Sequence, residues 1–600
     1  MTDNKSKDKL FSDFRQITKA EWIEKIKTDL KGADYDKKLV WKFDENIRLQ
    51  PFYMAEDTRV ANIPYGKNKK NDWEIREPAS IDNITAIPEM LKRGADAITL
   101  SGINPADIKS IEMLFETVDL TTVPVHFTEV TSYTALAETL VKTAVKKGID
   151  SKKLKGSFGY DHYGYYLHHG EFYGSEQENI EELKRLTDYC TDNLPLFKIT
   201  NVDAAIHHNS GANIVSETAF ALAQGAEYLT ALTDAGTDIE DILSRMQFTF
   251  ATGSSYFPEI AKIRALRILW NTIASKFNEG KGSTMFIHSV SSSWNKAVYD
   301  PYINLLRTTT ETMSAIIGGC DAVTVLPLDN FYKNPGEVPQ RIARNQQIIM
   351  KEEVHLGKVA DPAGGSYYIE NLTAEIVEKA WDIFLEIENK GGFAKALESG
   401  YIFENIEKSA RKKDMDIAMR KINILGVNQF PNLKEEMLPE IEKEISAGAT
   451  GKGLKPYRGA EAFEILRLKT EQHFAAGNKK PVVFLLTYGN LNMRKARANF
   501  ALNFFGCAGF EVIDNNGFDT VAQGMEAARK ASADIIVFCS SDDEYPAMAA
   551  EVTNDKEKIV IAGLPPTAED IKAKGIDKFI HIKSNVLDEL AGYQKQVGIK

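Results

Sequence analysis

Cysteine is scarce in this chain of 600 residues, and long hydrophobic runs are missing. The cysteines lie far apart and form no CxxC pair or Cys/His cluster, which argues against a zinc site or a disulfide framework. The four are Cys190, Cys320, Cys507 and Cys539. The longest apolar runs have the length of a strand, far short of the ~20 residues that span a bilayer. Residues 1–19 lack the apolar segment of a secretory signal, so we expect a cytoplasmic protein without membrane contact.

Positive charge is also in deficit, because 73 Lys and Arg stand against 85 Asp and Glu, for a formal net charge of −12. Nucleic-acid-binding proteins usually carry a basic surface, so no nucleic-acid partner is expected. An apolar content of 43% and a charged content of 26% are ordinary for a globular protein. The length exceeds what one core supports, which predicts two or three domains.

A regular alternation of strand and helix patterns runs from about residue 85 to 385. Amphipathic helices, for example at 219–232 and 259–277, lie between several short apolar segments that are typical of strands. The predicted strands are 97–100, 125–128, 156–160, 204–207, 248–251, 285–288, 322–325 and 366–369. Such strand–helix units predict a (β/α)₈ TIM barrel, which we assign to residues 36–390.

Three further segments flank the predicted barrel. Residues 1–35 form a charged arm with helical spacing of Phe11, Phe14, Ile17, Trp22 and Ile26, and we expect its apolar side to contact the main domain or another subunit. The alternative is a mobile tail. Residues 391–478 are helical and charged, then rich in Gly and Lys, as in a linker. Residues 479–600 contain strand patterns at 482–486, 510–513, 534–539, 558–562 and 578–580, which predict a flavodoxin-like doubly wound sheet.

Three blocks of the barrel region have an unusual sequence. They are residues 256–270, YFPEIAKIRALRILW; residues 288–294, HSVSSSW; and a pair at 341–347, RIARNQQ, and 361–370, DPAGGSYYIE. Each block taken alone has a structural explanation, such as core-facing helix positions or a tight turn before a strand. Their joint order does not, and together with the last domain it resembles the methylmalonyl-CoA mutase family over nearly the whole chain. This resemblance implies adenosylcobalamin-dependent radical isomerisation of succinyl-CoA and (R)-methylmalonyl-CoA.

The cofactor loop of the family is altered in this sequence. Members carry Asp-x-His-x-x-Gly after the first strand of the last domain, and that histidine ligates cobalt. The matching positions here are Asn492, Arg494 and Arg497. Arginine stays charged and only donates hydrogen bonds, so it cannot be a metal ligand. Of the nearby histidines, His473 and His581 are not on this loop, and His581 is better explained as the end of a strand.

Two further cofactor positions also depart from the family. Its Ser-x-Leu turn corresponds to Ser540-Ser541-Asp542-Asp543, which places acids where a buried nucleotide tail would pass. Its Gly-Gly pair corresponds to Ala562-Gly563, and the added methyl would crowd a close backbone approach. We therefore predict no cofactor-binding and no metal-binding residue on this chain.

The substrate positions are altered in the same way. The family's Tyr-x-x-Arg-Pro-Trp-Thr-x-Arg resembles residues 68–76, where Trp73 and Arg76 match but Asn68 and Asn71 replace the tyrosine and the first arginine. Tyr65 lies close enough for a local shift to restore a phenol.

A second substrate motif, His-x-x-x-Ala-Gly-Ala, corresponds to the run that ends at Ser210-Gly211-Ala212. Strict spacing places Ile206 at the histidine, with His207 one position later. Losses in both the cofactor set and the substrate set predict that this chain has no catalytic residues.

The family includes heterodimers of a catalytic large subunit and a degenerate small subunit, and this chain resembles the small one. The resemblance then implies a large-subunit partner that binds the adenosylcobalamin of the heterodimer. Two alternatives stay open. One is a mutase that is active alone on an acyl-CoA, and the other is a CoA-binding or chaperone-like partner without turnover.

Overall fold

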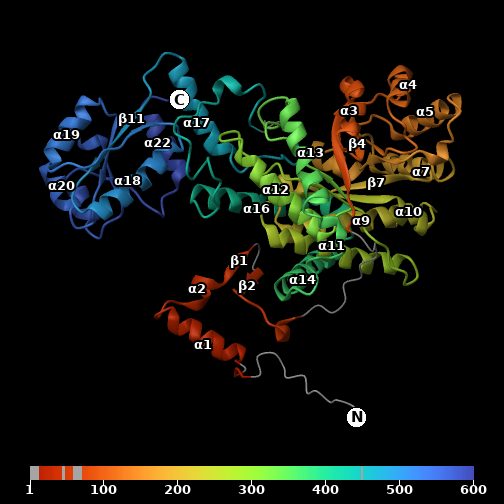
Figure 1. Ribbon diagram of the computed structural model, residues 1–600, viewed down its shortest axis with the longest axis horizontal. Helices are drawn as coiled ribbons and strands as arrows, with labels where there is room; N and C mark the ends of the chain where they lie inside the picture. Colours follow the sequence, from red (N-terminus) through yellow and green to blue (C-terminus); the bar gives the residue numbers. More distant parts are fainter. Residues whose placement is uncertain (1–12, 16, 44–46, 59–70, 447–450, 600) are drawn as a thin grey trace, which may run out of the picture.

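The computed structural model describes residues 13–15, 17–43, 47–58, 71–446 and 451–599. Figure 1 shows a barrel surrounded by helices, a second α/β unit at the C-terminal end, and a group of small N-terminal elements drawn in red below the barrel. No helix in the described part of the chain is both long and apolar enough to cross a membrane.

The described residues form a closed barrel of eight parallel strands, which confirms the predicted TIM barrel. The strand order is β10-β3-β4-β5-β6-β7-β8-β9, and the barrel closes where β10 pairs with β3. The strands are β3 (Glu74–Ser80), β4 (Ala97–Ser101), β5 (Val125–Thr128), β6 (Gly156–Tyr160), β7 (Phe197–Asp203), β8 (Met246–Thr252), β9 (Ile287–Ser291) and β10 (Ala322–Thr324). The carboxyl ends of all these strands open at one face, where barrels of this class hold their functional sites.

Two predicted barrel strands are wrong, and two barrel strands of the described structure, β3 and β7, were not predicted. Residues 204–207 lie in the turn and helix that follow β7, and residues 366–369 begin a long helix. The aromatic and β-branched run at 366–369 suggests a strand, but apolar side chains such as Ile376 and Phe384 continue it with helical spacing. The strand β3 was missed because it contains Glu74, Arg76 and Pro78, which are unusual in a central strand.

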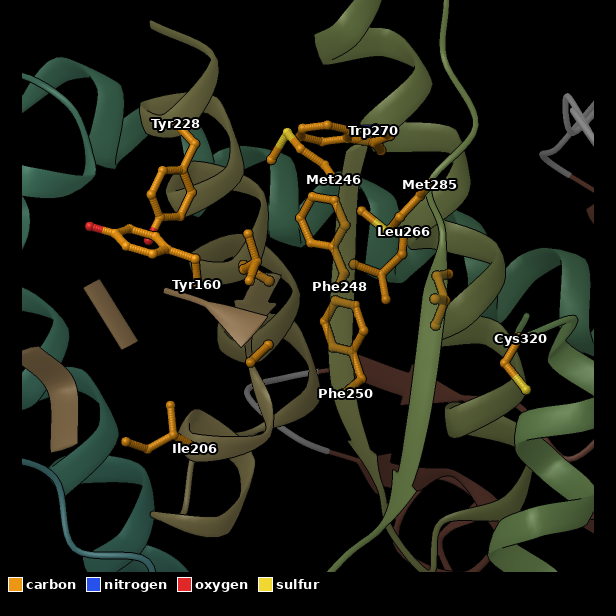
Figure 2. Close-up of a cluster of buried hydrophobic side chains, with 14 of the residues drawn as sticks. Tyr160, Ile206, Tyr228, Met246, Phe248, Phe250, Leu266, Trp270, Met285 and Cys320 are labelled. Atoms are coloured by element: carbon orange, nitrogen blue, oxygen red, sulfur yellow. The ribbon is translucent and has the colours of Figure 1, made fainter. Parts of the chain in front are cut away.

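Helices cover the outside of the barrel and bury apolar side chains against it. Phe248 of β8 lies 4.7 Å from Trp270 of α11, ring centre to ring centre, in the cluster that Figure 2 shows between these two elements. The helices are α3 (Ile87–Lys92), α4 (Ile108–Thr117), α5 (Tyr133–Lys146), α6 (His162–His169), α7 (Glu176–Asn193), α8 (Ala205–Asn209), α9 (Ile214–Asp234), α10 (Ile239–Arg245), α11 (Tyr256–Phe277), α12 (Ile303–Gly318), α13 (Glu337–Glu352) and α14 (Tyr367–Asn389).

The predicted arm of residues 1–35 contains α1 (Lys19–Asp29). It is followed by α2 (Tyr35–Leu39), β1 (Trp41–Phe43) and β2 (Ile47–Leu49), and Phe43, Ile47 and Leu49 are buried in the same apolar cluster as the barrel core. Neither helix buries a residue, and Trp22 stays 52% exposed although its ring touches Phe52. Tyr53 packs on Tyr368 of α14 and so attaches the arm to the barrel. Of the positions named for this arm, Phe11 lies outside the described residues.

A connecting segment joins the barrel to the second unit through α15 (Phe393–Glu398), α16 (Tyr401–Ala418) and α17 (Glu461–Ala475). The backbone N–H of Val298, in the loop after β9, donates to Glu464 of α17 at 2.5 Å. The N–H of Gly459 donates to the carbonyl of Trp294 at 2.7 Å. These contacts fix α17 over the loop after β9.

The second unit is built on a five-stranded parallel sheet, and all five predicted strands are present. The strands are β11 (Val482–Thr487), β12 (Glu511–Ile513), β13 (Ile535–Cys539), β14 (Ile559–Ala562) and β15 (Lys578–Ile580). The helices are α18 (Leu491–Gly506), α19 (Val521–Lys530), α20 (Tyr545–Glu551), α21 (Ala568–Ala573) and α22 (Val586–Gln596). Side chains of α18 and α22 share one apolar core with the sheet, and those of α19, α20 and α21 share another. The order β12-β11-β13-β14-β15 fits the predicted doubly wound arrangement.

Candidate functional site

The carboxyl edge of the second sheet is the first place to look for a ligand. Doubly wound sheets bind ligands outside the carboxyl ends of their strands, where the strand order reverses, and here that point lies between β11 and β13. Beyond β11 the side chain of Asn490 accepts hydrogen bonds from the backbone of Asn492 and Met493, each at 3.1 Å. This cap begins α18 and fixes the directions of the side chains in its first turns.

Arg494 stands in the first turn of α18 and bridges two loops of this edge. Its Nη2 donates to the carbonyl of Asn516 at 2.9 Å, and its Nη1 donates to the carbonyl of Gly489 at 3.4 Å. A Cβ placed on Gly517 would lie 2.5 Å from Cζ of Arg494, so the guanidinium rests directly on the loop after β12. The residue at the predicted cobalt-ligand position is therefore a cation tied to the chain's own backbone.

Arg497, one turn further along α18, closes the rest of the edge. Its Nη2 lies 2.8 Å from Oδ1 of Asp542, which follows β13, so the ion pair crosses the point where the strand order reverses. A Cβ placed on Gly563, directly after β14, would lie 3.0 Å from Cζ of Arg497. Arg497 therefore contacts the residues that follow both β13 and β14 at this edge.

The serines that follow β13 are also engaged within the chain. The hydroxyl of Ser541 donates to Oε2 of Glu544 at 2.8 Å. The hydroxyl of Ser540 contacts the same carboxylate and lies 2.8 Å from the carbonyl of Tyr488. Burial acts to raise the pKa of Glu544, but the hydrogen bonds from both serines outweigh it and lower the pKa. Ala562 lies in the core, where its carbonyl accepts from the hydroxyl of Tyr545 at 2.8 Å.

The two histidines of this region do not lie on the loop between β11 and α18. His473 is part of α17, and His581 follows β15, where its Nδ1 accepts from the backbone of Lys583 at 3.1 Å. Burial, and then the charge of Lys583, lower the pKa of His581. Among the residues that the structure describes, no group of three or more His, Cys, Asp and Glu side chains is arranged to hold a metal ion.

Polar side chains occupy the interior of the barrel, where bulky branched residues dominate in most TIM barrels. The Nε of Arg76 donates to Glu74 at 2.6 Å, and Nε2 of His126 lies 2.7 Å from the same carboxylate oxygen. The Nδ1 of His126 lies 2.8 Å from the hydroxyl of Ser157, which also accepts from Gln247 at 3.0 Å. These contacts join β3, β5, β6 and β8 in one hydrogen-bonded network.

Charge compensation within this network shifts its pKa values. Burial acts to raise the pKa of Glu74, but the charges of Arg76 and His126 outweigh it and lower the pKa strongly. Burial, and then the charge of Arg76, lower the pKa of His126. The matched residue Arg76 of the substrate motif is thus paired inside the barrel with Glu74 of its own strand.

The other described positions of that motif serve packing. The side-chain amide of Asn71 donates to the carbonyl of Ile316 at 2.8 Å, and Trp73 is buried with Lys351 over its ring. Asn68 and Tyr65 lie outside the described residues, so the predicted loss of the tyrosine stays a prediction.

Two acids lie at the carboxyl ends of neighbouring strands, Asp161 just after β6 and Asp203 at the end of β7. Asp161, after β6, accepts hydrogen bonds from the hydroxyl of Tyr228 at 2.6 Å, from Gln224 at 2.7 Å and from the backbone of Asp203 at 2.8 Å. Burial raises the pKa of Asp161, and burial followed by the charge of Asp161 raises that of Asp203 to about 7. Asp161 is thus held by hydrogen-bond donors of the chain itself.

The position of the family histidine is occupied by buried residues. Ile206 and His207 both lie in α8, and the ring of His207 is fully buried and packs edge-on against Phe220 of α9. Burial lowers the pKa of His207 to about 4. His207 is thus a neutral residue packed between helices.

Three features of these sites were not predicted from the sequence. The polar network of the barrel went unnoticed because β3 was not recognised as a strand. Asp161 directly follows β6 and Asp203 is the last residue of β7, which is the signal that could have placed them at the carboxyl face. Arg497 and Asp542 were both singled out, but they are 45 positions apart, and nothing in the sequence pairs them.

A parallel barrel of eight strands followed by a five-stranded parallel sheet defines a two-domain α/β protein. In each of these two folds, ligands bind at the carboxyl ends of the strands. Within this class, the family model for methylmalonyl-CoA mutase matches residues 92–458. The chain belongs to the methylmalonyl-CoA mutase family.

The similarity to individual relatives extends along the whole chain. The chain is 40% identical to the methylmalonyl-CoA mutase small subunit of Porphyromonas gingivalis, over 99% of this chain and 100% of that protein. It is 32% identical to the small subunit of Streptomyces virginiae, over 90% and 91% of the two chains. For the small subunit of Propionibacterium freudenreichii subsp. shermanii the identity is 30%, over 90% and 88%.

Cobalamin, the cofactor that the family implies, does not fit the second sheet of this chain. The ligand position holds Arg494, which has no lone pair to offer a metal and is bonded to two carbonyls. The adjoining edge is crossed by the Arg497–Asp542 ion pair.

Proposed function

We propose that this chain is the non-catalytic small subunit of a heterodimeric methylmalonyl-CoA mutase. In this role it supports the adenosylcobalamin-dependent radical isomerisation of succinyl-CoA and (R)-methylmalonyl-CoA by the large subunit. The observation that carries the proposal is the position of Arg494, which replaces the cobalt-ligating histidine and donates to the carbonyls of Gly489 and Asn516. On this proposal the chain contributes no catalytic, cofactor-binding or metal-binding residue, and the large subunit binds the cobalamin.

The proposal gives each segment a role. Residues 36–390 are the barrel of an acyl-CoA mutase that no longer turns over, and residues 391–478 are the linker. Residues 479–600 are a degenerate cobalamin-binding domain of the flavodoxin-like type, whose strand order and two covered faces support this assignment. Residues 1–35 form an arm that contacts the large subunit.

Exposure of the arm supports its place in the interface. The aromatic side chain of Trp22 is half exposed, Ile17 is equally open, and neither α1 nor α2 buries a residue in the isolated chain. Obligate interfaces are large and rather apolar, and an arm that is unburied on its own chain provides such a surface.

The physical task of the subunit is then to stabilise the large subunit by covering its apolar surface. All four cysteines are buried thiols, which agrees with a reducing compartment, and we place the heterodimer in the cytoplasm.

Reconstitution tests the proposal directly. The isolated chain should have no mutase activity, and mixing with the large subunit should yield a heterodimer with one cobalamin and full activity. The large subunit alone should be less stable or less active than the heterodimer. Turnover by the isolated chain would instead support an independently active mutase, and association with the large subunit without any effect on it would contradict the proposed role.

The structure offers little to the alternative of an independently active enzyme. That alternative requires His207 or Tyr65 to have taken over a lost role. His207 is buried against Phe220, and Tyr65 lies outside the described residues. A CoA-binding partner without turnover is distinguished by titration of the isolated chain with CoA, which should show no saturable binding if the barrel network is intact.

A further inference from the structure

The loop after β12 contains the one Asn-Gly pair of this chain. Asn516 is followed directly by Gly517, and no other asparagine in the sequence precedes a glycine. A glycine has no side chain to shield its backbone nitrogen, so that nitrogen can approach the side-chain carbonyl carbon of the residue before it. Asn516 is exposed, and its side-chain amide has no hydrogen-bond partner among the described residues. The side chain is therefore free to turn toward the nitrogen of Gly517.

Gly517 is required at its position by the backbone and by Arg494. Its φ is +108°, a conformation that favours glycine over residues with a side chain. The guanidinium of Arg494 already occupies the place that a Cβ would take at this residue. The arginine at the predicted ligand position therefore keeps a glycine directly after Asn516.

Arg494 also contacts the peptide group that contains the nitrogen of Gly517. Its Nη2 lies 2.9 Å from the carbonyl oxygen of Asn516, which belongs to that same peptide group. Amide resonance couples the two atoms, so a nitrogen that loses its proton passes negative charge to this oxygen. A donor placed where charge develops stabilises the charged species. The guanidinium is in this position.

One contact opposes loss of the proton. The N–H of Gly517 donates to Oδ1 of Asn515 at 3.1 Å, and this hydrogen bond is given up when the proton leaves. It joins two neutral groups, whereas hydrogen bonds that involve an ionised group are roughly twice as strong. The contact with Arg494 is therefore the larger of the two effects.

We propose that Asn516 is a site of covalent modification, deamidated by the backbone nitrogen of Gly517 with assistance from Arg494. Hydroxide removes the N–H proton of Gly517, and the nitrogen then forms a bond to Cγ of Asn516. The bond from Cγ to the side-chain nitrogen breaks, and ammonia leaves after taking a proton from water, which yields a cyclic succinimide. One water molecule then opens the ring at either carbonyl and gives aspartate or isoaspartate. No oxidant or reductant takes part.

The product changes the edge of the second sheet. Either product adds a negative charge beside Arg494, and isoaspartate also lengthens the backbone of the loop by one methylene. The new carboxylate is expected to compete with the carbonyls of Gly489 and Asn516 for the guanidinium. The modification does not depend on the proposed subunit function.

Peptide mapping by mass spectrometry tests the proposal on the full chain. After incubation in a mildly alkaline buffer, the peptide with Asn516 should gain one mass unit and contain both aspartate and isoaspartate. Its rate of formation should rise with the hydroxide concentration. Asn492 is the internal reference and should stay intact, because it is exposed at the same edge but is followed by a methionine in α18. An intact Asn516 after an incubation in which the urea-unfolded chain has reacted fully would overturn the proposal.

Variants of Arg494 test its part in the reaction. Arg494→Met removes the charge and the donors, and deamidation should slow about threefold to tenfold, a range that allows for screening by water at this exposed contact. Arg494→Lys keeps the charge and should retain most of the rate. Lys495→Met is the matched control, because it removes an exposed cation from the same helix, and its rate should equal that of the wild type. An equal or faster rate in Arg494→Met would contradict the role of Arg494. The wild-type measurement stands even if a variant does not fold.

Discussion

The guanidinium of Arg497 and the carboxylate of Asp542 lie 2.8 Å apart across the point where the strand order of the second sheet reverses. In doubly wound sheets this point is open to a ligand. Here it is spanned by a pair of side chains from α18 and from the loop after β13. On the proposed function, the change at this edge therefore involves more than the replacement of one histidine by Arg494.

Restoring the histidine alone should not restore the cofactor. In Arg494→His the Arg497–Asp542 pair still crosses the edge, so the isolated variant should retain no cobalamin after gel filtration, as judged by visible absorbance. Arg494→Gln serves as the control for loss of charge without a new ligand. Stoichiometric cobalamin in Arg494→His would show that the edge is open and that only the ligand was missing.

The buried cation Lys262 should be essential for the stability of the barrel. Its Nζ lies 3.1 Å from Glu217 and 2.8 Å from Glu259, and all three side chains are buried. Burial acts to lower the pKa of Lys262, but the two carboxylates outweigh it and raise the pKa. Lys262→Met leaves both acids without their cation, and we expect a loss of about 3–5 kcal/mol in the free energy of unfolding, measured with urea.

The matched control for that variant is Lys142→Met. Lys142 forms an exposed pair with Glu138 one helical turn away, a contact worth about 0.3–0.5 kcal/mol. A similar loss in both variants would contradict the role of burial in this prediction.

Asp203 should make the barrel less stable as the pH rises. Its folded pKa of about 7 lies above the ordinary value of 3.8, so between these values the folded state holds a proton that the unfolded state has lost. Stability from this group is therefore present below about pH 4 and lost as the pH rises to about 7, by up to about 1.4 kcal/mol per pH unit. Asp203→Asn should remove this slope and be the more stable protein at pH 8. Parallel stability curves of the two proteins, from urea unfolding between pH 4 and 8, would refute the assignment.

The exposed arm should matter for association but not for the fold of the chain. Trp22→Ser removes an aromatic side chain that is 52% exposed, so the free energy of unfolding of the isolated chain should change by less than about 0.5 kcal/mol. Buried interface tryptophans are often hot spots, so binding to the large subunit should weaken at least about tenfold, measured by titration calorimetry. Tyr173→Ser, at an exposed position of the barrel, is the control and should leave binding unchanged. Equal binding by both variants would remove the arm from the interface.

Local patterns predicted most of the architecture. The three central strands of the second sheet, β11, β13 and β14, are continuous apolar runs, because both faces of that sheet are covered by helices. The barrel strands were harder to predict. The side chains of Glu74 and Arg76 on β3 point into the barrel, where they form hydrogen bonds, so this strand lacks an apolar pattern. The run at 366–369 was assigned to a strand because its first residues favour one, although the longer helical period of α14 decides the structure.

The candidate site was predictable in its residues but not in its arrangement. The sequence places Arg494 at the ligand position, yet its contact with Asn516 depends on how the loop after β12 approaches α18. Asp161 and Asp203 are 42 positions apart in the chain, and they lie close together only because β6 pairs with β7. Such contacts follow from tertiary structure, which local patterns do not specify.

The most direct test of the central claim is an equilibrium titration of the isolated chain with adenosylcobalamin, followed by visible absorbance after removal of free cofactor. We predict no retained cobalamin for this chain alone and one cobalamin per heterodimer when the large subunit is present. Stoichiometric cobalamin on the isolated chain would contradict the conclusion that Arg494 and the Arg497–Asp542 pair have closed the site.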